Sequence, residues 1–140
     1  MGKILLKDLA EELNDPDNIQ RSARTMKSVL YAITNMLSFE DSIQFLKMVP
    51  LYAKGIEQNG WTIGNNNVEQ VRKIEDLTTE LQKINHEYYQ VDFPNQKETE
   101  WAIQSVFRVL CWHTDQEKMY HIKTLLPEDL QYFLEDYAVV

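Results

Sequence analysis

SVLYAITNMLSFEDSIQFLKMVP, residues 28–50 of the chain, aligns without a gap on SVFRVLCWHTDQEKMYHIKTLLP, residues 105–127, about 77 positions later. Both stretches end in an apolar pair followed by proline, and Glu40 matches Glu117. Further apolar positions coincide: Ala32, Ile33, Ile43, Phe45, Met48 and Val49 align with Val109, Leu110, Tyr120, Ile122, Leu125 and Leu126. A shared hydrophobic register of this kind indicates one helical unit that is used twice.

The composition suits one all-α domain that spans residues 1–140. A hydrophobic share of 44% with 26% charged residues is ordinary for a globular protein, and 140 residues can bury a sizeable core. Only four glycines and four prolines argue against a fold with many turns between strands. No segment alternates polar and apolar residues as a strand does, so we expect no sheet.

The charge, the hydropathy and the single cysteine limit the possible partners and the location of the protein. A net charge of −8 is unsuited to contacts with a phosphate backbone, so we expect no nucleic-acid partner. No apolar run is long enough for a membrane span. The N-terminal residues lack the pattern of a signal peptide, and the lone Cys111 suits a reducing compartment. These features predict a cytoplasmic protein.

Caps and prolines predict the helices of the first unit, which we place at residues 3–60. Residues 4–13 form an amphipathic helix, and a second helix covers 16–37, with Asp15 as N-cap, Pro16 as its first residue and Ile19 among its inward positions. Ser38 caps a third helix that ends near Met48, because Pro50 disfavours helical geometry before it. A short helix at 51–58 follows.

A loop at residues 61–67 separates this unit from the second, at 68–138. Its predicted helices cover 68–88, 96–112, 115–125 and 128–137, and residues 114–117 form a capping box in which Thr114 is the N-cap. The whole chain is then a compact bundle of about eight helices. Pro50 and Pro127 are expected at equivalent places about a pseudo-twofold axis.

The second unit carries about nine extra residues, which we place in the stretch 85–95. This stretch contains His86, Tyr88 and Phe93. It could be a packed lid or a longer connection, and loop-length preferences favour the connection.

No motif in the chain points to a known chemistry. Neither Glu-x-x-His nor His-x-x-Glu occurs, and the closest approach to a ligand cluster is Cys111 and His113 with His121 one helix later. A buried free cysteine is more simply a small packing residue. We therefore predict no metal, no other cofactor and no catalytic residue.

Four residues are the candidates for partner or ligand binding. Tyr52, Lys54 and Trp61 surround the hinge between the units, and His86 belongs to the extra stretch. A packing role for Trp61 in the seam is the simpler alternative. The aromatic residues of the second unit, including Trp101, Trp112 and Tyr120, belong to the core or to a self-association surface.

Around Pro50 the sequence resembles a known family. Pro50, Lys54, Gly55, Gly60 and Trp61 match a pattern typical of the bacterial domain of unknown function 2267, in which two helical repeats each carry a leucine-proline corner. The second corner, at residues 126–127, also fits. Glu57 and Gln58 depart from the pattern, because aromatic residues are usual there. The resemblance implies a compact all-helical fold in a bacterial protein and brings no established activity, substrate or cofactor.

Two functional hypotheses follow. The first is a non-enzymatic module that binds a protein partner or a second copy of itself, since aromatic residues are abundant and no catalytic constellation is recognisable. The alternative is a small-molecule binder or enzyme that uses the seam between the two repeats, near Trp61 and residues 86–93.

Overall fold

The computed structural model of the chain describes residues 2–49 and 74–131. Within these residues it consists of helices and connections without a strand, which confirms the predicted all-α class. The helices are α1 (Gly2–Glu12), α2 (Ile19–Met36), α3 (Phe39–Met48), α5 (Ile74–Ile84), α6 (Tyr89–Asp92), α7 (Gln96–Trp112) and α8 (Gln116–Leu125). Residues 128–131 are helical as well.

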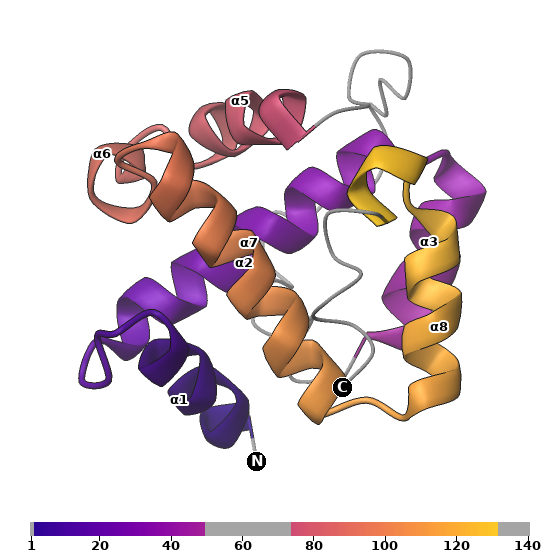
Figure 1. The fold of residues 1–140 in the computed structure, drawn as a ribbon, viewed down its shortest axis with the longest axis horizontal. Coiled ribbons are helices and arrows are strands. Elements are labelled where there is room, and N and C mark those ends of the chain that lie inside the picture. Colours follow the sequence, from indigo (N-terminus) through magenta and orange to yellow (C-terminus); the bar gives the residue numbers. More distant parts are fainter. Residues whose placement is uncertain (1, 50–73, 132–140) are drawn as a thin grey trace.

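Two long helices, α2 and α7, form the centre of the bundle (Figure 1). They cross and pack on each other, and each also packs against α1 and α5. Helices α3 and α8 lie side by side, next to the ends of α2 and α7 that precede them in the chain. The pair α2 and α7 thus contacts α1 and α5, and α3 and α8 pack on each other beside it.

One hydrophobic core joins the two halves of the sequence. Its buried side chains come from all these helices except α6: among them are Leu5, Leu9, Met26, Leu30, Ile33, Phe45, Leu77, Leu81, Ile103, Phe107, Leu110 and Ile122. Phe93, which directly follows α6, is also fully buried in this core. Burial of an aliphatic or phenyl side chain contributes about 1.5–3 kcal/mol, so this shared core is the main source of stability.

The corner regions of the two units have matching boundaries. Helix α8 begins and ends at the positions that correspond to the two ends of α3 in the gapless alignment. Phe45 and the aligned Ile122 are both fully buried. Val49 and Leu126 end their helices with extended backbone, as expected before proline. Pro50 lies outside the described residues, and the pseudo-twofold relation of the units stays a prediction.

The N-cap of α8 differs from the predicted one. Asp115 accepts a hydrogen bond from the backbone N–H of Lys118, whereas the buried hydroxyl of Thr114 has no hydrogen-bond partner among the described residues. In the first unit Ser38 caps α3 in the predicted way. Asp115 is the residue that aligns with Ser38. An aspartate is the stronger cap, because its carboxylate also interacts favourably with the helix dipole.

The start of α2 also corrects the sequence-based prediction. Asn18, and not Asp15, is the N-cap: its side chain accepts from the N–H of Arg21. Asp15 is already used at the end of α1, where its N–H bonds to the carbonyl of Ala10 and Asn14 adopts a left-handed φ of 61°. This Schellman arrangement needs two residues beyond the helix, so α2 starts later. Ile19 consequently lies at the helix start, 38% exposed, instead of inward.

The stretch 85–95 is more ordered than a simple connection. Helix α5 ends at Ile84, earlier than the predicted Tyr88, and α6 follows after a turn. Asn85, Asp92 and Phe93 are buried. The stretch does connect α5 to α7, but it is packed on the body of the protein. Helix α7, in contrast, has the predicted bounds.

Among the described residues, no helix combines the length and the apolarity that crossing a membrane requires. The predicted short helix at 51–58, the loop at 61–67 and the first part of the helix predicted from residue 68 lie outside the described residues.

The two possible caps of α8 can be separated by mutation. Asp115→Ala should lower the free energy of unfolding by about 1 kcal/mol, because the N–H of Lys118 loses its acceptor. Thr114→Ala should cost less, since the hydroxyl it removes makes no hydrogen bond within the described residues. Urea denaturation followed by circular dichroism measures both. A larger loss for Thr114→Ala would overturn the assignment.

Candidate functional site

Among the cavities on the surface of the described residues, two lie beside the central helices. The first, here called the Arg24 cavity, has a volume of about 200 Å³ and lies where α2 meets the turn between α5 and α6. Its lining residues are Arg24, Lys27, Ser28, Ile84, Asn85, His86, Glu87 and Tyr88. Arg24, Lys27 and Ser28 belong to α2. Ile84 is the last residue of α5, and the remaining lining residues follow it directly in the chain. Residues of the stretch 85–95 therefore build one wall of the cavity.

A buried carboxylate holds this wall in place. Asp92 has a fully buried side chain and pairs with Arg24 through two hydrogen bonds, Nε to Oδ2 at 2.9 Å and Nη2 to Oδ1 at 3.0 Å. The side-chain amide of Asn85 donates a third bond to Oδ2 at 2.9 Å. The Nε of Arg21 lies 3.7 Å from Oδ1. Because a buried charge is tolerated only with good partners, this network joins residues 85–92 firmly to α2.

The same network fixes the guanidinium of Arg24. Its hydrogen bonds to Asp92 raise the pKa of Arg24 above its ordinary value; burial opposes this rise, and the charge of Asp92 adds to it. The guanidinium carbon also lies 4.2 Å from the centre of the Tyr88 ring, within the range of a cation–π contact. Arg24 is therefore a rigid, permanently charged group at the cavity.

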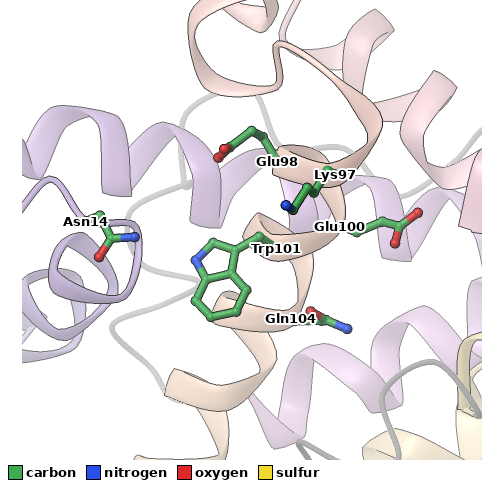
Figure 2. Close-up of a pocket in the computed structure, with 6 residues that line it drawn as sticks. All are labelled: Asn14, Lys97, Glu98, Glu100, Trp101 and Gln104. Atoms are coloured by element: carbon green, nitrogen blue, oxygen red, sulfur yellow. The ribbon is translucent and has the colours of Figure 1, made fainter.

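The second cavity, here called the Trp101 cavity, is larger, with a volume of about 440 Å³. It lies between the first turns of α7 and the connection that follows α1, and it is lined by Asn14, Lys97, Glu98, Glu100, Trp101 and Gln104. Figure 2 shows the Trp101 ring projecting toward the Asn14 side, with Glu100 and Gln104 on the opposite side. The left-handed backbone of Asn14 brings this residue to the rim.

The Trp101 side chain is held in one orientation by contacts with α1 and α7. Its indole N–H donates to the backbone carbonyl of Glu12 at 2.9 Å, across 89 positions of the sequence. The guanidinium of Arg108 lies 5.0 Å from the ring centre and pairs with the carboxylate of Glu12. Trp101 nevertheless keeps 38% of its surface exposed. An exposed but fixed tryptophan is a suitable element for binding.

Only one of the four candidate residues can be placed. His86 is exposed and lines the Arg24 cavity. Tyr52, Lys54 and Trp61 lie outside the described residues, so their roles stay predictions.

The residues weighed as metal ligands have separate surroundings. His113 pairs with Asp8 of α1 at 2.9 Å, and His121 lies on α8 with its ring against Tyr120. Cys111 is half-buried against the core. Within the described part of the chain, no group of three or more histidine, cysteine, aspartate or glutamate side chains could hold a metal ion.

Sequence reasoning missed the charged network and the fixed tryptophan. One signal was available: Arg21, Arg24 and Lys27 recur every third residue, which places them along one side of a helix. Asp92, by contrast, lies 68 positions from Arg24 and gives no local sign that it will be buried. Nothing in the sequence around Trp101 distinguishes a tryptophan fixed at the surface from a tryptophan of the core.

The comparison with known families gives one match. The family described as "Uncharacterized conserved protein (DUF2267)" matches residues 3–133, so the chain belongs to this family. The match confirms the resemblance noted around Pro50. No match to the chain is found among the curated proteins.

The buried ion pair should be essential for stability. Asp92→Ala leaves Arg24 and Arg21 without their shared carboxylate and should lower the free energy of unfolding by about 3 kcal/mol. Asp92→Asn keeps the shape and should cost less. The exposed neighbour Glu87→Gln is the control, and it should stay within about 0.5 kcal/mol of wild type. Urea denaturation measures all three, and a neutral Asp92→Ala would refute the role of the network.

Proposed function

We propose that this chain is a non-catalytic binding module that accepts a positively charged segment of a partner protein in the Trp101 cavity. The fixed orientation of Trp101 is the observation that carries the proposal. Its indole N–H bond to Glu12 and its contact with Arg108 are both made within the chain itself. A side chain ordered in advance loses little entropy on binding, so more of the contact energy appears as affinity.

Tryptophan is also the residue type most suited to this role. A few aromatic anchors supply most of the binding energy in protein interfaces, and tryptophan is enriched among them. Trp101 exposes part of a large ring next to the polar side chains of Lys97, Gln104 and Asn14. This combination of an apolar surface and a polar rim is typical of the centre of a protein interface.

The charge around the cavity favours a cationic partner. Glu98 and Glu100 line it against a single lysine, Lys97. Of the five carboxylates in the neighbouring segment 8–20, Asp8, Glu12 and Asp15 pair with basic side chains of other segments, and the whole chain has a net charge of −8. The guanidinium of Arg108 lies 5.0 Å from the centre of the Trp101 ring, and this cation–π contact supports a ring that attracts positive charge. A lysine or arginine side chain of a partner would thus meet both carboxylates and an aromatic ring.

The same charge argues against self-association through this surface. A second copy would bring the same acidic residues to the contact, and like charges facing each other cost free energy. A different protein with a basic segment is therefore the partner that this surface suits. The proposal includes a cytoplasmic location, which Cys111, the single cysteine of the sequence, supports because thiols persist in reducing compartments.

Fluorescence anisotropy with labelled peptides tests the proposal. A short peptide rich in lysine and arginine should bind the wild-type chain, and a matched peptide rich in glutamate should not. Trp101→Ala should weaken binding by about 10-fold or more, given the usual contribution of a tryptophan anchor. Glu98→Gln combined with Glu100→Gln should also weaken binding, because it removes the attraction to the basic side chain.

Trp112→Ala is the matched control. Trp112 lies on the same helix and is more exposed, at 53%, but it does not line the cavity. This change should alter the affinity less than two-fold, on the scale expected for residues outside an interface centre. Equal effects of Trp101→Ala and Trp112→Ala, or equal binding of the acidic peptide, would contradict the proposal.

A further inference from the structure

The chemistry of the Trp101 cavity specifies its partner further, an inference that rests on the function proposed above. We propose that the cavity selects arginine over lysine, with the partner's guanidinium stacked on the Trp101 ring and hydrogen-bonded to Glu98 and Asn14. Three features support this selectivity: the polar groups left at the cavity, the contact that the ring already makes, and the cavity volume.

Hydrogen-bond acceptors lie next to an aromatic surface in this cavity. The indole N–H of Trp101 is already used by the carbonyl of Glu12, so the ring offers a ligand only its π surface. Among the described residues, no hydrogen bond or ion pair involves the Glu98 carboxylate or the Asn14 side chain. Figure 2 shows Glu98 and the Trp101 ring projecting from α7 toward the Asn14 side. A cation on this side therefore meets a flat ring, a carboxylate and an amide oxygen.

The net charge of the lining is small, so charge alone does not set the preference. Glu98 and Glu100 line the cavity with one lysine, Lys97, and Oε2 of Glu100 already accepts from the side-chain amide of Gln96 at 2.8 Å. Within the described part of the chain, Glu98 is thus the lining carboxylate with both oxygens available to a partner. Arginine and lysine carry the same charge to it, and the shape and hydration of the cation decide which binds better.

A guanidinium already lies within cation–π range of this ring. The guanidinium carbon of Arg108 is 5.0 Å from the centre of the Trp101 ring, and its charge is balanced by the carboxylate of Glu12. Because Glu12 neutralises Arg108, a second cation at the ring is repelled only weakly. The partner's arginine would repeat the same combination of ring and carboxylate, with Glu98 in place of Glu12.

A guanidinium suits these groups better than an ammonium. It is planar and weakly hydrated, so it stacks on an aromatic ring while its N–H groups remain in the plane for acceptors at the edge. The lysine ammonium is a strongly hydrated point charge, which has to lose water in order to contact the ring. The cavity volume of about 440 Å³ lies within the usual range of about 300–1,000 Å³ for ligand sites and leaves room for an arginine side chain.

Fluorescence anisotropy with three matched peptides and the full chain tests the selectivity. The peptides share one length and sequence, with every basic position filled by arginine in the first, lysine in the second and neutral citrulline in the third. We expect the arginine peptide to bind about five-fold or more tightly than the lysine peptide, because stacking on tryptophan favours a guanidinium. The citrulline peptide keeps the shape of arginine without its charge and should bind far more weakly than the arginine peptide.

Variants of the cavity show where the preference arises. Trp101→Leu keeps an apolar side chain but removes the aromatic face, so the ratio of the two affinities should fall to about one. Trp112→Leu makes the same change at an exposed tryptophan outside the cavity and should keep the ratio. Glu98→Gln should weaken the arginine peptide several-fold, whereas Glu117→Gln, at an exposed position of α8, should not. All four positions are exposed, so each variant should retain the thermal unfolding transition.

Lys97→Gln separates the effect of charge from that of shape. It removes a positive charge from the cavity, so both basic peptides should bind more tightly while the ratio of their affinities stays the same. A change in the ratio alone would contradict the role given to the ring.

The failure of this inference is distinguishable from that of the proposed function. Equal affinities of the arginine and lysine peptides, tight binding of the citrulline peptide, or a preference retained in Trp101→Leu would each overturn the arginine selectivity. Equal affinities that are both lost in Trp101→Ala would overturn the selectivity and leave the binding module in place. Binding of neither basic peptide would overturn both.

Discussion

The crossing of α2 and α7 is the constraint on which the rest of the structure depends. Each of these helices packs against the other and against α1 and α5, so each must be apolar on more than one side. Small hydroxyl residues assist the close packing: Ser22, Thr34 and Thr99 are buried and return their hydrogen bonds to carbonyls of their own helix. Such bonds satisfy a buried hydroxyl within its own helix, so that no partner from another helix is needed. The crossing thus forms a core to which both halves of the sequence contribute.

The two cavities arise where this core reaches the surface along the central helices. The Arg24 cavity lies beside α2, and its second wall is the packed segment between α5 and α7. The Trp101 cavity lies beside α7, next to the end of α1. In both places a charged or aromatic side chain is fixed by a contact far away in the sequence, Arg24 by Asp92 and Trp101 by Glu12. Fixed groups of this kind bind at a lower entropic cost.

Local signals predicted the helices well, and they failed where two signals competed. Prolines and apolar spacing placed α3, α7 and α8 within a residue or two of their observed bounds. Asp15 and Thr114 both look like N-caps, but Asp15 is used to end α1 and Asp115 is the better cap next to Thr114. The stretch 85–95 looked like a connection, since nothing in the sequence shows that Asp92 has a partner on α2. Of the candidate binding residues, only His86 lies at a cavity of the described chain.

The sequence by itself determined the helical class and most helix ends of the described residues, because caps, prolines and apolar periodicity act over a few residues. It also carried the family resemblance that the match over residues 3–133 confirms. Only the tertiary structure decided which polar groups became rigid. The pairing of Arg24 with Asp92 spans 68 positions and that of Trp101 with Glu12 spans 89, and both form only after the core has brought distant helices together. The candidate sites depend on these long-range contacts, and no local pattern encodes them.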